Sequence, residues 1–195
     1  MSTNHLSSAP PRQVRALFSE TTVRVYQAFS PEIANAALAA QTFKPPFKRD
    51  RMTWIKPSFA WMMYRSGYAT KLGQGRILAV DILRTGFEWA LEHSCLTHFD
   101  ASLHDSQEAW EARLEVAPVR IQWDPERTAR LEALPWRTIQ VGLRGAAVRA
   151  YLDEWIVRID DVTMLVGEVR DALKDADMSR VQSALPIEVP YPLPN

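Results

Sequence analysis

The stretch that decides the fold is VRVYQAFSPEIANAAL, residues 23–38, in which a strand pattern passes directly into a helix pattern. Residues 23–28 alternate β-branched or aromatic side chains with polar ones, which is typical of a strand. Ser30 is a favourable N-cap, and Pro31 is favourable at the first helical position. Apolar side chains then recur at helical spacing, at Ile33, Ala34, Ala37 and Leu38. The stretch therefore predicts a strand, a tight turn and a helix.

The same criteria apply along the rest of the chain. They predict strands at 52–55, 76–83, 119–123, 137–143 and 155–159, and helices at 57–66, 85–91, 107–116, 145–152 and 162–173. Asp124 and Pro125 are expected to form a turn or to begin a helix. Because strands and helices are mixed without strict alternation, the sequence predicts an α+β fold.

The length of 195 residues fits one compact domain with a single core. We expect a flexible N-terminal tail at residues 1–11, a single globular domain at 12–183 and a proline-rich C-terminal tail at 184–195. Lys plus Arg and Asp plus Glu each number 23, so the net charge is zero. That balance disfavours a protein that coats nucleic acid through bulk charge, and any anion site must be local.

Several other classes of protein are disfavoured by what the sequence lacks. A single cysteine, Cys95, excludes a disulfide framework and a zinc ribbon built from cysteine pairs. The histidines and Cys95 within 93–105 match no standard metal-ligand spacing, so no metal is expected. G-x-S-x-G, Walker and G-x-G-x-x-G motifs are absent. Without a membrane-length apolar run or a signal peptide, we expect a cytoplasmic protein that does not associate with membranes.

A basic and aromatic segment, FKRDRMTWIKPSFAWMMYR at residues 47–65, is the densest candidate for a binding site. Its aromatic side chains can stack on a base or on nicotinamide while its cations hold phosphates. The residues concerned are Lys48, Arg49, Arg51, Lys56 and Arg65, interleaved with Trp54, Phe59, Trp61 and Tyr64. This pattern predicts a site for a nucleotide or dinucleotide. An amphipathic helix preceded by a charged loop is the alternative interpretation.

Glu154 is the second candidate, because it immediately precedes the apolar strand expected at 155–159. Its carboxylate is therefore expected to emerge at the end of that strand rather than inside the core. A carboxylate in such a position is more often a solvated charge than a catalytic group.

Nearly the whole chain, from Arg12 to about Arg170, resembles a bacterial family of unknown function, domain-of-unknown-function family 4291. The resemblance rests on motifs at residues 24–30, 51–67, 93–100, 122–127 (QWDPER) and 153–163. Three pieces also resemble the ADP-ribosyltransferase superfamily: VYQAFSPEIANAALAAQTF at 25–43, TWIKPSFAWMMY at 53–64, and Glu154 with the Trp-Ile-Val that follows it. That superfamily has mixed sheets with flanking helices, and this resemblance implies the same fold here.

The resemblance also implies an activity, the transfer of ADP-ribose from NAD to an acceptor. Glu154 would stabilise the oxocarbenium-like transition state. Arg24 or Gln27 would orient the ribose or pyrophosphate; some members have a histidine near the position of Gln27. The phosphates would be neutralised by Lys56, Arg51 and Arg65, the nicotinamide would stack on Trp54, Trp61 or Tyr64, and Thr53, Ser58 or Tyr64 would match the serine or tyrosine of the second piece.

Protein, nucleic acid and small molecules all remain open as the acceptor, and the sequence does not determine the oligomeric state. A non-catalytic module that binds nucleotides or single-stranded RNA through residues 47–65 is the alternative function. A structural or interaction domain, in which the tryptophans only fill a core, is the third.

Overall fold

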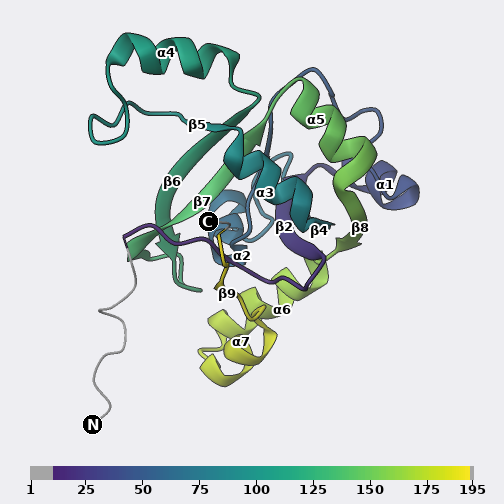
Figure 1. The fold of residues 1–195 in the computed structure, drawn as a ribbon. Coiled ribbons are helices and arrows are strands. Elements are labelled where there is room, and N and C mark those ends of the chain that lie inside the picture. Colours follow the sequence, from purple (N-terminus) through teal and green to yellow (C-terminus); the bar gives the residue numbers. More distant parts are fainter. Residues whose placement is uncertain (1–10, 194–195) are drawn as a thin grey trace.

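The computed structural model describes residues 11–193 (Figure 1), and it confirms the α+β class. Its α-helices are α1 (Pro31–Ala40), α2 (Phe59–Ser66), α3 (Arg84–Glu92), α4 (Gln107–Val116), α5 (Ala146–Ala150), α6 (Thr163–Lys174) and α7 (Met178–Ala184). Its strands are β1 (Arg15–Ala16), β2 (Thr22–Phe29), β3 (Thr53–Ile55), β4 (Arg76–Leu83), β5 (Ser94–Leu96), β6 (Val119–Arg127), β7 (Ala133–Leu143), β8 (Ile156–Asp161) and β9 (Val189–Pro190). A π-helical turn, η1 (Tyr151–Trp155), continues α5.

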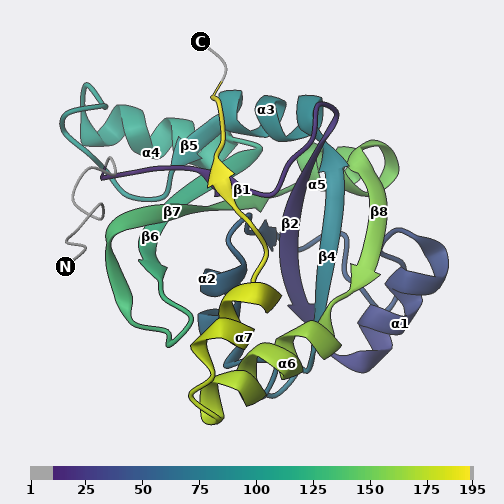
Figure 2. The same cartoon turned by 90° about the horizontal axis from the view of Figure 1, so that it is seen from below.

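The first sheet is antiparallel with the strand order β2-β4-β8, and Figure 2 shows these three strands side by side. Successive side chains of a strand point to opposite faces, and β2 and β4 each contribute to two cores. Val23 and Val25 lie in the core shared with the second sheet. Tyr26 faces the other way and packs with Phe59 of α2 and with α6 and α7.

The second sheet is mixed, with the order β3-β7-β6-β5, and only the β5–β6 pair is parallel. The prediction of a turn or a helix start at Asp124 and Pro125 is wrong, because β6 continues through both residues to Arg127. Its pairing with β7 shifts register between Pro125 and Arg127. A bulge of this kind accommodates a proline, which has no N–H to donate to a neighbouring strand.

The two sheets meet where β2 passes the residue that follows β3. The Tyr26 backbone N–H donates to the Lys56 carbonyl at 2.7 Å. Next to it, the Gln27 side-chain amide donates to the Thr53 hydroxyl at 2.8 Å. These contacts bring the middle of β2 beside the basic and aromatic segment, and the cleft described below lies there.

The proline-rich segment from residue 184 is packed on the domain, contrary to the expected tail. β9 pairs with β1, and Tyr191 is buried, with its hydroxyl donating to Glu88 at 2.7 Å. A proline is compatible with this position because a two-stranded sheet leaves one side of each strand unpaired. For the expected N-terminal tail, residues 1–10 lie outside the described residues, and the Pro11 carbonyl accepts a hydrogen bond from Arg137.

Within residues 11–193, none of the helices combines the length and the apolar character that crossing a membrane requires.

Candidate functional site

A cleft of about 840 Å³ lies between the two sheets, a volume typical of small-molecule and cofactor sites. It is lined by β2, β3, α2, the loops 46–52 and 72–74, and one glutamine each from β6 and β7. Of the predicted site residues, the cleft brings together Gln27, Arg51, Trp54, Lys56, Trp61 and Arg65, and Lys48 joins them. None of the described lining residues is acidic. The cleft is therefore a cationic site suited to an anionic ligand.

Lys56 is the buried cation of this cleft, with only 6% of its surface exposed. It directly follows β3, where the bridge to Tyr26 fixes its backbone. Burial, together with the nearby Arg65 guanidinium, lowers the pKa of Lys56 to about 7, and the Asp124 carboxylate opposes this shift. A small change in pH near neutrality therefore changes the fraction of Lys56 that is protonated.

Two tryptophans form apolar walls beside Lys56. The indole of Trp54 lies over Gly142 of β7, where an added Cβ would be 2.8 Å from the ring. A glycine at this position therefore lets the indole lie flat against the sheet. Trp61 is 6% exposed, and the Lys56 ammonium lies 5.2 Å from the centroid of its ring. This is within the range of a cation–π contact.

Gln27 lies at the cleft, but both ends of its side-chain amide are already bonded to protein groups. Its Nε2 donates to the Thr53 hydroxyl and, at 3.1 Å, to the Trp54 carbonyl. Its Oε1 accepts from the buried Tyr151 hydroxyl at 2.7 Å. Gln27 therefore joins β2, β3 and η1, and it acts as a positioning residue for the wall that carries Trp54.

A polar group that the sequence interpretation missed lies on β6 and β7. Gln140 donates through Nε2 to the Gln122 side-chain oxygen at 2.5 Å and to the Asp124 carboxylate at 2.6 Å. Gln122 and Gln140 line the cleft, so the Asp124 carboxylate is one hydrogen bond away from it. A strand that continued through QWDPER would have indicated this group, because residues 122 and 124 then share one face of the strand. The sequence was instead interpreted as a turn or helix start at Asp124.

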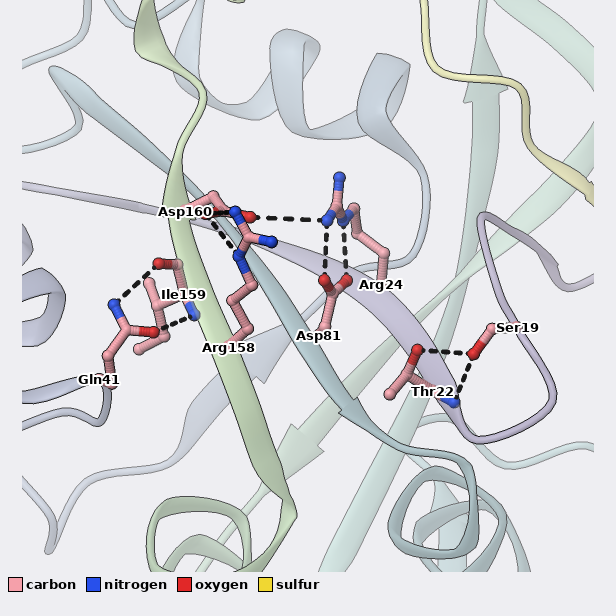
Figure 3. Close-up of polar contacts among 8 residues, drawn as sticks. All are labelled: Ser19, Thr22, Arg24, Gln41, Asp81, Arg158, Ile159 and Asp160. Atoms are coloured by element: carbon pink, nitrogen blue, oxygen red, sulfur yellow. Dashed lines mark hydrogen bonds and ion pairs between the residues drawn. The ribbon is translucent and has the colours of Figure 1, made fainter.

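Arg24 does not line the cleft, although the sequence interpretation grouped it with Gln27. The two residues are three apart on β2, so their side chains lie on opposite faces of the sheet. Figure 3 shows Arg24 bound to Asp81 through two hydrogen bonds, of 2.8 and 2.7 Å, with Asp160 at 3.7 Å. Arg24 is therefore part of an ion-pair network between β2, β4 and β8.

Ser58 and Tyr64 also lie outside the cleft lining. Ser58 is the N-cap of α2, where its hydroxyl accepts from the Trp61 backbone N–H at 3.1 Å and donates to the buried Glu126 at 2.8 Å. It lines a smaller cavity of about 220 Å³ instead. Tyr64 is 41% exposed, and the Arg127 guanidinium lies 3.7 Å from the centroid of its ring.

Glu154 is not among the residues that line the cleft, although its predicted role requires a carboxylate beside the bound ligand. It lies in η1, one turn before β8, and its side chain is exposed and absent from the cleft lining. The neighbouring Tyr151, Leu152 and Trp155 are the side chains of this turn that are buried in the core. The structure therefore gives Glu154 no place in this cleft.

No cluster of three or more histidine, cysteine, aspartate or glutamate side chains within residues 11–193 is arranged to hold a metal ion.

These features define an α+β protein with a cationic cleft walled by tryptophans. The chain belongs to the family described as Domain of unknown function (DUF4291), which matches residues 13–191. This confirms the family resemblance, and the match includes the docked C-terminal segment. A search of curated proteins finds no match. The comparisons do not support the resemblance to the ADP-ribosyltransferase superfamily, which stays a hypothesis.

Proposed function

We propose that this protein binds NAD in the cationic cleft and transfers its ADP-ribose to an acceptor, as an ADP-ribosyltransferase-like enzyme. The observation that carries the proposal is the composition of the cleft, which combines four cations and two tryptophans with no acidic residue in the described lining. A dinucleotide has the matching chemistry, because its pyrophosphate is anionic and its two ring systems can stack.

In this proposal the cations neutralise the pyrophosphate. Arg51 and Arg65 are exposed at the cleft and can each present a planar fork to phosphate oxygens. The nicotinamide ring would stack on Trp54 or Trp61, and Gln122 and Gln140 would supply amide groups to the ribose or the carboxamide.

Asp124 takes the catalytic role that the resemblance assigned to Glu154. The bond from C1 of the ribose to the nicotinamide nitrogen breaks, and nicotinamide leaves with the bonding electron pair as a neutral molecule. The sugar then carries positive charge, and a carboxylate near it stabilises this transition state more than the ground state. A nucleophile of the acceptor forms the new bond to C1 and loses its proton to solvent.

The test is nicotinamide release from NAD by the purified protein, measured by chromatography. Asp124→Asn should reduce the rate on the order of 10²-fold or more, because it removes the charge and keeps the shape. Glu154→Gln should leave the rate within about twofold, since its side chain lies outside the cleft. Thermal melting of both variants serves as the folding control. An unchanged rate in Asp124→Asn with folding intact would reject the assignment.

A non-catalytic nucleotide or single-stranded RNA binding module is the second candidate. It is favoured by the lack of a carboxylate among the described lining residues, because binding needs the cations and tryptophans alone. This function predicts no release of nicotinamide, an affinity that falls steeply with salt, and binding that survives Asp124→Asn but fails in Arg51→Ala with Trp61→Ala. Affinity insensitive to salt would count against it.

A further inference from the structure

Two buried hydrogen-bond donors, on side chains that contribute to the cleft lining, lack adequate acceptors among the described residues. The Lys56 amine has three donor positions when protonated, and its acceptor is the Trp54 carbonyl at 3.5 Å, a long distance for a hydrogen bond. The Trp61 indole Nε1 has no hydrogen-bond partner among the described residues. Both side chains are 6% exposed, and both line the cleft.

Buried donors are nearly always paired, because losing water without gaining an acceptor is unfavourable. Here the two donors belong to neighbouring side chains, since the Lys56 amine lies 5.2 Å from the centroid of the Trp61 ring. The described residues form ten ion pairs with nitrogen–oxygen distances within 4 Å, and Lys56 takes part in none of them. An anion supplied by a ligand would provide acceptors for both donors at once.

The charges around Lys56 agree with an anionic occupant. Arg65 on α2 is close enough to disfavour the protonated amine, and Asp124 on β6 is close enough to favour it. Lys48 and Arg51 from the loop 46–52 line the same cleft. Cations therefore outnumber the carboxylate, and an oxyanion among them would lower their mutual repulsion.

We propose that Lys56 and Trp61 form a buried oxyanion subsite, which together with Arg65 holds a phosphate group of the ligand. Lys56 is protonated when the phosphate is bound. The proposal rests on the proposed nucleotide cleft and specifies where the phosphate binds. No covalent bond changes. The free protein holds Lys56 partly as the neutral amine, and the bound anion stabilises the ammonium form, so one proton moves from the buffer to the Lys56 nitrogen.

The experiment is isothermal titration calorimetry of the full chain with ADP at pH 8.0, in Tris and in HEPES. The two buffers differ in ionisation enthalpy, so the difference in heat counts the protons taken up. Because the pKa of Lys56 is about 7 in the free protein, we expect close to one proton per ADP bound. Above pH 7, the affinity for ADP should fall by up to tenfold per pH unit.

Three variants separate the subsite from general electrostatics. Lys56→Met should abolish proton uptake and weaken ADP binding, whereas the matched change Lys48→Met, at an exposed position of the same cleft, should weaken binding and keep the uptake. Trp61→Phe keeps an aromatic ring at this position and removes the indole N–H, and it should weaken binding roughly tenfold. The melting temperature of each variant shows whether it folds.

Two results for the wild-type protein overturn the subsite: no binding of ADP, or binding without proton uptake. An uptake that persists in folded Lys56→Met does the same, because another group then takes the proton. Failure of the subsite is distinguishable from failure of the proposed activity. If the protein releases nicotinamide from NAD but takes up no proton on binding ADP, only the proposed subsite is rejected. If ADP binds with proton uptake but no nicotinamide is released, only the proposed activity is rejected.

Discussion

Replacing Lys56 by methionine should make the protein more stable, and by more at low pH than at high pH. Methionine has a similar length and no charge, so it removes a buried amine that has no carboxylate partner within 4 Å among the described residues. The pKa of Lys56 is about 7 in the folded protein, against an ordinary value of 10.5. Between these pH values the unfolded chain holds a proton that the folded protein lacks.

The magnitude follows from proton linkage. Below pH 7 both states hold the proton, and the full penalty of burying the ammonium group is present. As the pH rises from 7 towards 10.5, wild-type stability recovers by about 1.4 kcal/mol per pH unit from this group. The advantage of Lys56→Met over wild type should therefore shrink by roughly 2 to 3 kcal/mol between pH 6 and pH 9.

Urea unfolding of both proteins at several pH values between 6 and 9 measures this difference. The control is Lys48→Met, which removes an exposed lysine from the same cleft and should change the free energy of unfolding by less than about 0.5 kcal/mol throughout. Parallel stability curves for wild type and Lys56→Met would refute the reasoning, because the buried amine would then carry the same charge in both states.

Three further predictions concern the cleft wall and the docked C-terminal segment. Gly142→Ala sets a Cβ 2.8 Å from the Trp54 ring, so unfolding experiments should show a loss of about 1 to 3 kcal/mol and calorimetry a weaker affinity for ADP. Tyr191→Phe removes the hydrogen bond to Glu88, and it should cost about 1 kcal/mol in urea unfolding. Burial raises the pKa of Glu188 to about 8, so between pH 5 and pH 8 the melting temperature of wild type should fall relative to Glu188→Gln.

The elements with strong local patterns were predicted well. β4 has the predicted bounds, and α2 ends at Gly67, which adopts the left-handed conformation expected of a C-cap. The pattern at residues 23–38 produced β2 and α1, although Ser30 makes no side-chain capping bond. Two errors occurred where strand pairing overrode a local signal: β6 pairs with the next strand, β7, through Pro125, and β9 pairs with the distant strand β1.

The candidate site divides in the same way. Lys56, Trp54 and Trp61 were found because they are close in sequence, and a helix that follows a short strand keeps them close in space. Asp124 was missed because a local turn signal hid the strand face that it shares with Gln122. Glu154 lies outside the cleft lining, which the sequence did not show, because it placed this residue before a strand without indicating which way the turn faces.

By itself the sequence determined the order of most helices and strands, the α+β class, and a basic and aromatic segment that contributes to the cleft. Each of these depends on neighbours within about ten residues, where side-chain periodicity and capping act. Only the tertiary structure decided that Lys56 is buried without a carboxylate partner among the described residues, that Arg24 is bound by Asp81, and that Asp124 is hydrogen-bonded to Gln140 of the cleft lining. Those properties depend on pairing between β2, β4, β6 and β7, whose residues are far apart in the chain.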